Sequence, residues 1–194
     1  MKKIRFGIIL VLAVMLLSGC REATFDADEN TVYVKKNKTF IGALVEDFAE
    51  IYYDADELRT FIDNEIKAYN ASVGAVNLEV STYEVESNKA KLFINYTDAG
   101  DYAGFNGVTF FAGTVEEALS AGYNFDASFI QVKDKGEVDS GTITSHNKYY
   151  VVITDEQNSI QVQGTIVYAT SNVELVSKSV AKTPGGEIAY IVFK

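Results

Sequence analysis

The chain has 194 residues, and its 27 acidic residues outnumber its 17 basic residues, which gives a formal net charge of −10 at pH 7. Such an acidic surface repels nucleic acid phosphates, so DNA and RNA are excluded as partners. A single histidine and a single cysteine exclude His-rich metal sites and any catalytic arrangement that needs a second histidine.

The N-terminus carries three basic residues among its first five, an apolar run over 6–17, and then Leu17-Ser18-Gly19-Cys20. This order is typical of a secretory signal peptide, and the run is shorter than the roughly 20 apolar residues of a membrane-spanning helix. The last four residues resemble the lipobox of bacterial lipoproteins. That resemblance implies cleavage before Cys20 and a diacylglycerol on its sulfur, which anchors the protein to the extracytoplasmic face of the cell membrane.

We therefore expect residues 1–19 to form the signal peptide, residues 20–30 a polar tether and residues 31–194 one domain. Residues 137–147 are polar and mark a candidate subdomain boundary. Beyond the lipobox, the mature part is similar in general organisation to uncharacterised lipoproteins of Gram-positive bacteria. That likeness implies no functional residues.

Alternating apolar residues over 31–47 predict a β-hairpin that turns at residues 35–38. Asp54 then offers a helix N-cap, followed by acidic residues in the first turn. A stripe at the helical period predicts a helix that buries one face and ends near residues 72–74. The stripe consists of Leu58, Phe61, Ile62, Ile66 and Tyr69.

Residues 76–81 and 90–96 predict a long antiparallel pair with one solvated face. Short helices follow over 98–106 and from a capping box at Thr114 to Gly122, with short strands on either side of the second. The rest is predicted to be strand: residues 149–154, 160–170, 173–177 and 188–193. The expected class is α+β, an antiparallel β-sheet with one main amphipathic helix and two short helices.

Asp26, Asp28 and Asn30 have the spacing of the first calcium ligands in an EF-hand loop. The loop fails at Thr31, where a glycine is needed, and at Asn37, where a bidentate Glu is needed. No nucleophile elbow, P-loop or dinucleotide-binding fingerprint occurs, and the lone histidine sits in a polar stretch where we expect it to be solvated. We predict neither a metal nor a cofactor.

Adjacent tyrosines are the remaining candidates for a binding surface, because neighbouring residues on a strand face opposite sides and one of each pair can be exposed. These are Tyr52, Tyr53, Tyr149 and Tyr150. Exposed tyrosine rings stack on sugars or anchor partner proteins. We predict a membrane-anchored, surface-exposed, non-catalytic binding module with an envelope or extracellular partner. The alternative is an envelope or glycan hydrolase that uses paired carboxylates.

Replacing Cys20 with Ala should abolish acyl labelling of the protein and its partition into a detergent phase, because the diacyl group is attached to that sulfur. Metabolic labelling with a fatty acid measures the first and phase separation the second. Label and partition that persist in Cys20→Ala would show that the lipobox interpretation is wrong.

Overall fold

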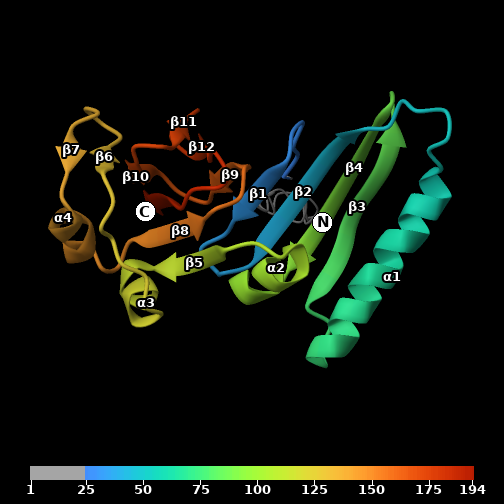
Figure 1. The fold of residues 1–194 in the computed structure, drawn as a ribbon, viewed down its shortest axis with the longest axis horizontal. Coiled ribbons are helices and arrows are strands. Elements are labelled where there is room, and N and C mark those ends of the chain that lie inside the picture. The colour runs from blue at the N-terminus through green and yellow to red at the C-terminus, as the bar shows by residue number, and fades with distance from the viewer. Residues whose placement is uncertain (1–24) are drawn as a thin grey trace, which may run out of the picture.

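The computed structural model describes residues 25–194, which form thirteen strands in two sheets and four helices (Figure 1). Strands hold 37% of these residues and helices 23%. The expected α+β class with a single antiparallel sheet is therefore wrong, and the described chain is mainly β. None of its helices is long and apolar enough to cross a membrane.

Sheet A has seven strands, and β1 and β9 in its middle run parallel while the other pairs are antiparallel. From edge to edge they are β11 (Glu174–Leu175), β12 (Val180–Lys182), β9 (Ser159–Val162), β1 (Thr31–Val34), β2 (Phe40–Asp47), β4 (Lys89–Tyr96) and β3 (Leu78–Glu86).

Sheet B has six antiparallel strands. In spatial order they are β5 (Phe110–Thr114), β8 (Tyr150–Thr154), β13 (Ala189–Phe193), β10 (Ile166–Thr170), β6 (Phe129–Gln131) and β7 (Glu137–Val138).

The chain passes between the sheets at Gly164, inside the segment 160–170 that was expected to be one strand. A Cβ at this position would lie 2.5 Å from the backbone oxygen of Lys194, so a side chain cannot be accommodated without a backbone shift. The segment is divided into β9 in sheet A and β10 in sheet B. This division explains why one predicted sheet is two.

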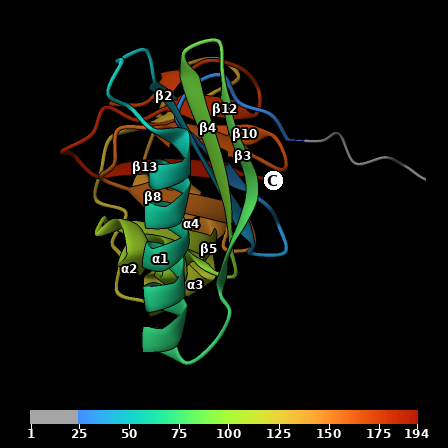
Figure 2. The ribbon, with the colours of Figure 1, turned by 90° about the vertical axis from the view of Figure 1, so that its right-hand side faces the viewer.

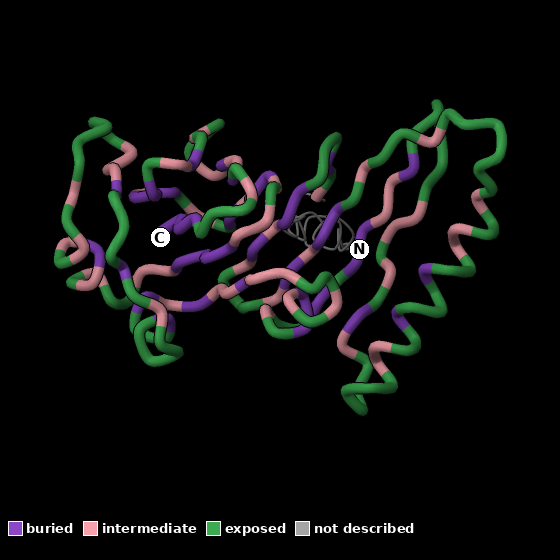
Figure 3. Tube along the Cα trace, in the orientation of Figure 1, coloured by how far each residue is buried: buried purple, intermediate pink, exposed green. Residues whose placement is uncertain are grey.

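Two hydrophobic clusters hold the sheets. The larger joins them, since Phe40 and Ile94 of sheet A pack in one cluster with Val152 and Ile191 of sheet B. The second lies against sheet B under two short helices, α3 (Val115–Ser120) and α4 (Ser140–Ser145). In Figure 3 the buried stretches follow the strands, whereas α1, at the end of the molecule away from α3 and α4, is mostly exposed.

The helix α1 (Ala55–Val73) begins and ends where the sequence predicts. Asp54 caps it by accepting hydrogen bonds from the amides of Asp56 and Glu57 at 2.8 and 3.0 Å, and Gly74 ends it with φ of 70°. The helix lies beside the edge strand β3 (Figures 1 and 2).

Fewer residues of the apolar stripe on α1 are buried than the sequence predicts. Within the helix only Ile62 and Ile66 are buried, and Phe61 is 61% exposed. Because successive residues turn about 100° around a helix axis, Phe61 and Ile62 cannot both point at the same contact line. The expectation that Phe61 is buried is wrong.

The helix α2 (Ala99–Asn106) packs on the same face of sheet A through Tyr102, which is buried against Tyr96. Gly42 of β2 makes room for both rings, because a Cβ there would lie 3.0 Å from the Tyr96 ring and 3.3 Å from the Tyr102 ring. The hydroxyl of Tyr102 donates a hydrogen bond to Glu156 at 2.7 Å. These contacts fix α2 at one end of the sheet face that α1 also covers.

Truncating Ile66 to Ala should lower the free energy of unfolding by about 2 to 5 kcal/mol, because a buried side chain is lost from a packed core. Phe61→Ala should cost about 1 kcal/mol or less, and exposed Lys67→Ala about 0.5 kcal/mol or less, because little of either side chain is buried. Urea titrations measure all three. Equal costs for Ile66→Ala and Phe61→Ala would contradict the placement of α1.

Stability should fall steeply above pH 10. Burial raises the pKa of Tyr96 from 10.0 to about 12, and burial together with the nearby Glu156 charge raises the pKa of Tyr102. Because the pKa values of these tyrosines are higher in the folded state, their protonated forms stabilise the fold. This stabilisation is complete below the unfolded-state pKa and is lost as the pH rises toward the folded-state pKa. The two tyrosines together contribute a slope of about 2.7 kcal/mol per pH unit in that range.

Urea titrations between about pH 10.5 and pH 11.5 measure this slope, and Tyr102→Phe should reduce it by about 1.4 kcal/mol per pH unit. Loss of the Tyr102 hydroxyl also changes the free energy of unfolding by an amount that does not depend on pH. Comparing the pH slopes of the two proteins removes this constant amount. Identical slopes in the two proteins would contradict the burial of an ionisable Tyr102.

Candidate functional site

An open groove of about 1020 Å³ lies between α1 and the face of sheet A made by β2 and β4. We call it the α1 groove. Leu92 and Ile94 of β4 form its floor together with Leu44 of β2, and Leu58 and Phe61 stand on the α1 side. Phe105 of α2 also lines it.

Large apolar side chains are left uncovered in this groove. Leu44 on the floor is 40% exposed and Phe61 on the α1 side is 61% exposed, and both line the same cavity. Exposed apolar residues scattered singly are ordinary, whereas a contiguous apolar surface rimmed by polar groups marks an interaction site.

Hydrogen bonds hold α1 to β3 and the chain just before it near both ends of the helix. Near the N-terminal end, the hydroxyl of Tyr83 on β3 donates to the carbonyl of Ala55 at 2.6 Å. Near the C-terminal end, the Asn70 side chain accepts from the amides of Asn77 and Leu78 at 2.9 Å and donates to the Leu78 carbonyl at 2.8 Å. The helix is thus held beside β3 and leaves part of the β2 and β4 face open.

Tyr52 and Tyr53, predicted to belong to a binding surface, line the α1 groove. They lie in the loop before the helix, and their rings meet edge to face with centroids 5.0 Å apart. Tyr52 is 74% exposed. The pKa of Tyr53 is raised, mainly by the charge that an ionised Tyr52 would place beside it.

Tyr149 and Tyr150, the other two predicted residues, are half-buried and do not line the groove. The Tyr149 ring packs on His146 with centroids 4.7 Å apart, and the Tyr150 ring stacks on Phe193 at 5.4 Å. The structure brings together Tyr52 and Tyr53 but not all four tyrosines. His146, expected to be solvated, is half-buried beside Tyr149.

The charged residues that line the groove are all acidic. They are Glu46, Asp47, Asp54, Glu57 and Glu65. All five are exposed, so they stand at the rim of the apolar floor. Within residues 25–194 none of them forms an ion pair.

Two basic side chains near this region are engaged elsewhere, whereas Lys89 of β4 lies across from Asp47 in the β2–β4 ladder. Arg59 of α1 pairs with Asp63 at 2.9 Å, and Lys91 of β4 reaches Asp26 and Asp28 at 3.3 and 3.2 Å. The two aspartates that mimic calcium ligands in the sequence thus share one ammonium group. Among the described residues, no group of three or more His, Cys, Asp or Glu is placed to hold a metal ion.

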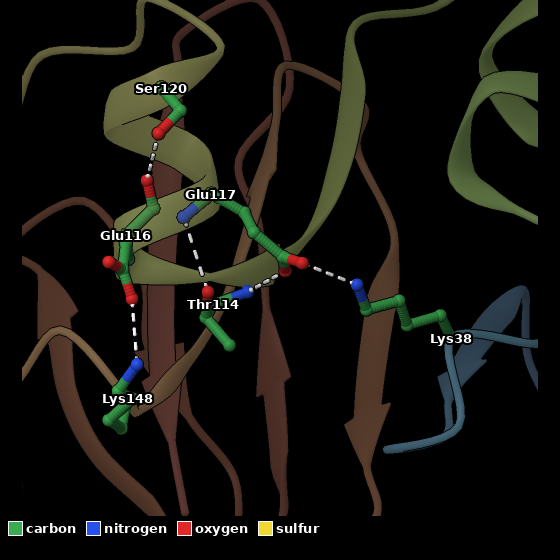
Figure 4. Close-up of polar contacts among 6 residues, drawn as sticks. All are labelled: Lys38, Thr114, Glu116, Glu117, Ser120 and Lys148. Carbon is green, nitrogen blue, oxygen red and sulfur yellow. Dashed lines mark hydrogen bonds and ion pairs between the residues drawn. The ribbon is translucent and has the colours of Figure 1, made fainter.

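A second polar cluster, shown in Figure 4, links the two sheets. Thr114 and Glu117 form the predicted capping box of α3, and Glu117 also accepts a hydrogen bond from Lys38 in the β1–β2 turn at 2.5 Å. This hydrogen bond is the main cause of the lowered pKa of Glu117. Each carboxylate in the cluster has a basic partner, because Glu116 pairs with Lys148 at 2.9 Å. We interpret the cluster as structural.

Tyr52 and Tyr53, named from the sequence as candidate binding residues, line the groove, whereas the groove itself was not predicted. The available signal was the adjacent pair Phe61 and Ile62 in the helical stripe, of which only one member can face the contact with the sheet. Comparison of the chain with protein-family models, with curated proteins and with solved structures gave no match. The shape and the charges of the α1 groove are therefore the features that bear on function.

Proposed function

We propose that the protein is a lipid-anchored, surface-exposed binding module that holds its partner in the α1 groove and carries out no chemistry there. The observation that supports this is the open apolar floor between Leu44 and Phe61. Grooves of this kind, mostly apolar with a few polar groups around them, are the common form of binding sites in proteins.

The position of the tether supports the same proposal. Phe25 and Ala27 pack against Phe93 of β4, whereas the next residue along the strand, Leu92, lines the groove. Because successive strand residues face opposite sides of a sheet, the chain enters sheet A on the face opposite to α1. A lipid on Cys20 would be at most about 18 Å of chain from Phe25, so the groove would face away from the bilayer.

Part of the predicted tether lies on the sheet as well. Glu29 accepts a hydrogen bond from Lys182 at 2.7 Å, and Asp26 and Asp28 pair with Lys91. A tether held in this way limits rotation of the domain about its anchor and favours an outward-facing groove. Nothing among the described residues favours the paired-carboxylate hydrolase, and we do not propose it.

Binding of the neutral, environment-sensitive dye Nile red tests whether the groove takes up apolar ligands. Residues 20–194 contain every described helix and strand, so this chain is the one to be measured, with Cys20 replaced by Ser. The double variant Leu44→Ala and Phe61→Ala should bind the dye about tenfold more weakly, because apolar contact area is lost on the floor and on the α1 side.

The matched control is Leu119→Ala with Val176→Ala, which removes side chains that are 43% and 52% exposed outside the groove. Its affinity for the dye should equal that of the parent chain. If the groove variant and the control bind Nile red equally well, or if the parent chain does not bind it, the proposed site is wrong.

A further inference from the structure

The side chains that line the α1 groove indicate what kind of partner fits it. This inference rests on the proposed function, in which the groove is a binding site. We propose that it binds a cationic amphipathic helix of another polypeptide, with the apolar face of that helix on the groove floor and its Lys or Arg side chains at the acidic rim.

The length of the groove fits a helix. Its lining runs along α1 from Asp54 to Ser72, the full length of the helix. At 1.5 Å per residue this is about 27 Å, the length of about 18 helical residues. A small molecule covers only part of such a length, whereas an amphipathic helix lies along it with one side chain per turn in contact with the floor.

The rim fits a basic partner, because it carries carboxylates on both walls. Asp54, Glu57 and Glu65 stand on the α1 side, and Glu46 and Asp47 stand on the β2 side. An amphipathic helix carries its polar residues on both flanks of its apolar stripe. Basic residues on these flanks would face carboxylates on each wall and relieve the repulsion among them.

The hydrogen bonds at the rim leave the negative charges available. Glu46 accepts from the Asn30 side chain at 2.8 Å and Asp47 accepts from the Ala49 amide at 2.9 Å, both of which are neutral donors. Asp54 caps α1. At the same end of the groove, the faces of Tyr52 and Tyr53 can receive a cation, which prefers electron-rich rings.

Charge disfavours the other occupants. A second copy of this chain would bring its own acidic rim against the first, and anionic lipid headgroups would be repelled in the same way. A neutral apolar molecule would fill the floor and leave the rim carboxylates without partners. Only a basic, amphipathic ligand satisfies the floor and both walls.

Fluorescence anisotropy with two labelled 18-residue peptides tests the proposal. Both peptides have leucine at the same helical positions, and the remaining positions are lysine in one and glutamate in the other. The chain 20–194 with Cys20→Ser should bind the lysine peptide and not the glutamate peptide. Binding should weaken when the ionic strength is raised from about 0.01 M to about 0.15 M, because the Debye length falls from about 30 Å to about 8 Å.

A charge-neutralising pair of variants locates the contact. Glu57→Gln with Glu65→Gln should weaken binding of the lysine peptide about fivefold, which corresponds to two exposed ion pairs. Neither glutamate side chain has a hydrogen bond or an ion pair among the described residues, and the Glu57 amide that donates to Asp54 is unchanged by the substitution, so the fold should be unaffected. Glu84→Gln with Glu137→Gln, two exposed glutamates outside the groove, changes the net charge equally and should leave the affinity within about twofold of the parent value.

The outcomes separate this inference from the proposed function. Equal binding of both peptides would overturn the proposal that the partner is a cationic helix, and so would equal weakening by the two groove substitutions and the two control substitutions. Either result would leave an apolar binding site in place. Nile red binding that depends on Leu44 and Phe61, with no binding of either peptide, would show that the groove takes a small apolar ligand instead. Absence of both dye and peptide binding would overturn the proposed function as well.

Discussion

The shape of the candidate site depends on how few contacts fix α1. Ile62 and Ile66 are its only buried side chains, and hydrogen bonds from Tyr83 and through Asn70 fix its position near the two ends. A helix held along such a narrow line covers one edge of a seven-stranded sheet and leaves the adjacent strands open. The apolar floor at Leu92 and Leu44 is therefore a direct result of where the helix is attached.

The larger hydrophobic core reaches α1 and the groove floor, because Ile62, Ile66 and Ile94 all belong to it. The large cluster joins the two sheets through Phe40, Ile94 and Ile191, and the smaller one lies between sheet B and two short helices. Tyr102 and Gly42 then fix α2 at the end of the open face. The groove lies at the margin of this core, where Ile94 is buried while Leu44 and Phe61 remain exposed.

Local elements were predictable from sequence because local chemistry determines them. Asp54 and Gly74 set the ends of α1, Thr114 and Glu117 form their capping box, and the alternation over residues 31–47 gives a hairpin. The division into two sheets was not predictable, because it depends on pairing with strands far away in the chain: β9 pairs with β1 and β10 pairs with β13. The exposure of Phe61 was missed for a similar reason: a periodic stripe tells which side of a helix is apolar, and not how much of that side a sheet covers.

The central claim is that the α1 groove is open in the free protein, and thiol accessibility tests it most directly. The chain has one cysteine, so Cys20→Ser gives a background free of thiols into which Phe61→Cys or Ile66→Cys can be introduced singly. Phe61→Cys should react with a maleimide about as fast as an unfolded thiol, and Ile66→Cys should be strongly protected until the protein is denatured. Equal protection of the two thiols in the native protein would show that the groove is closed and would contradict the account.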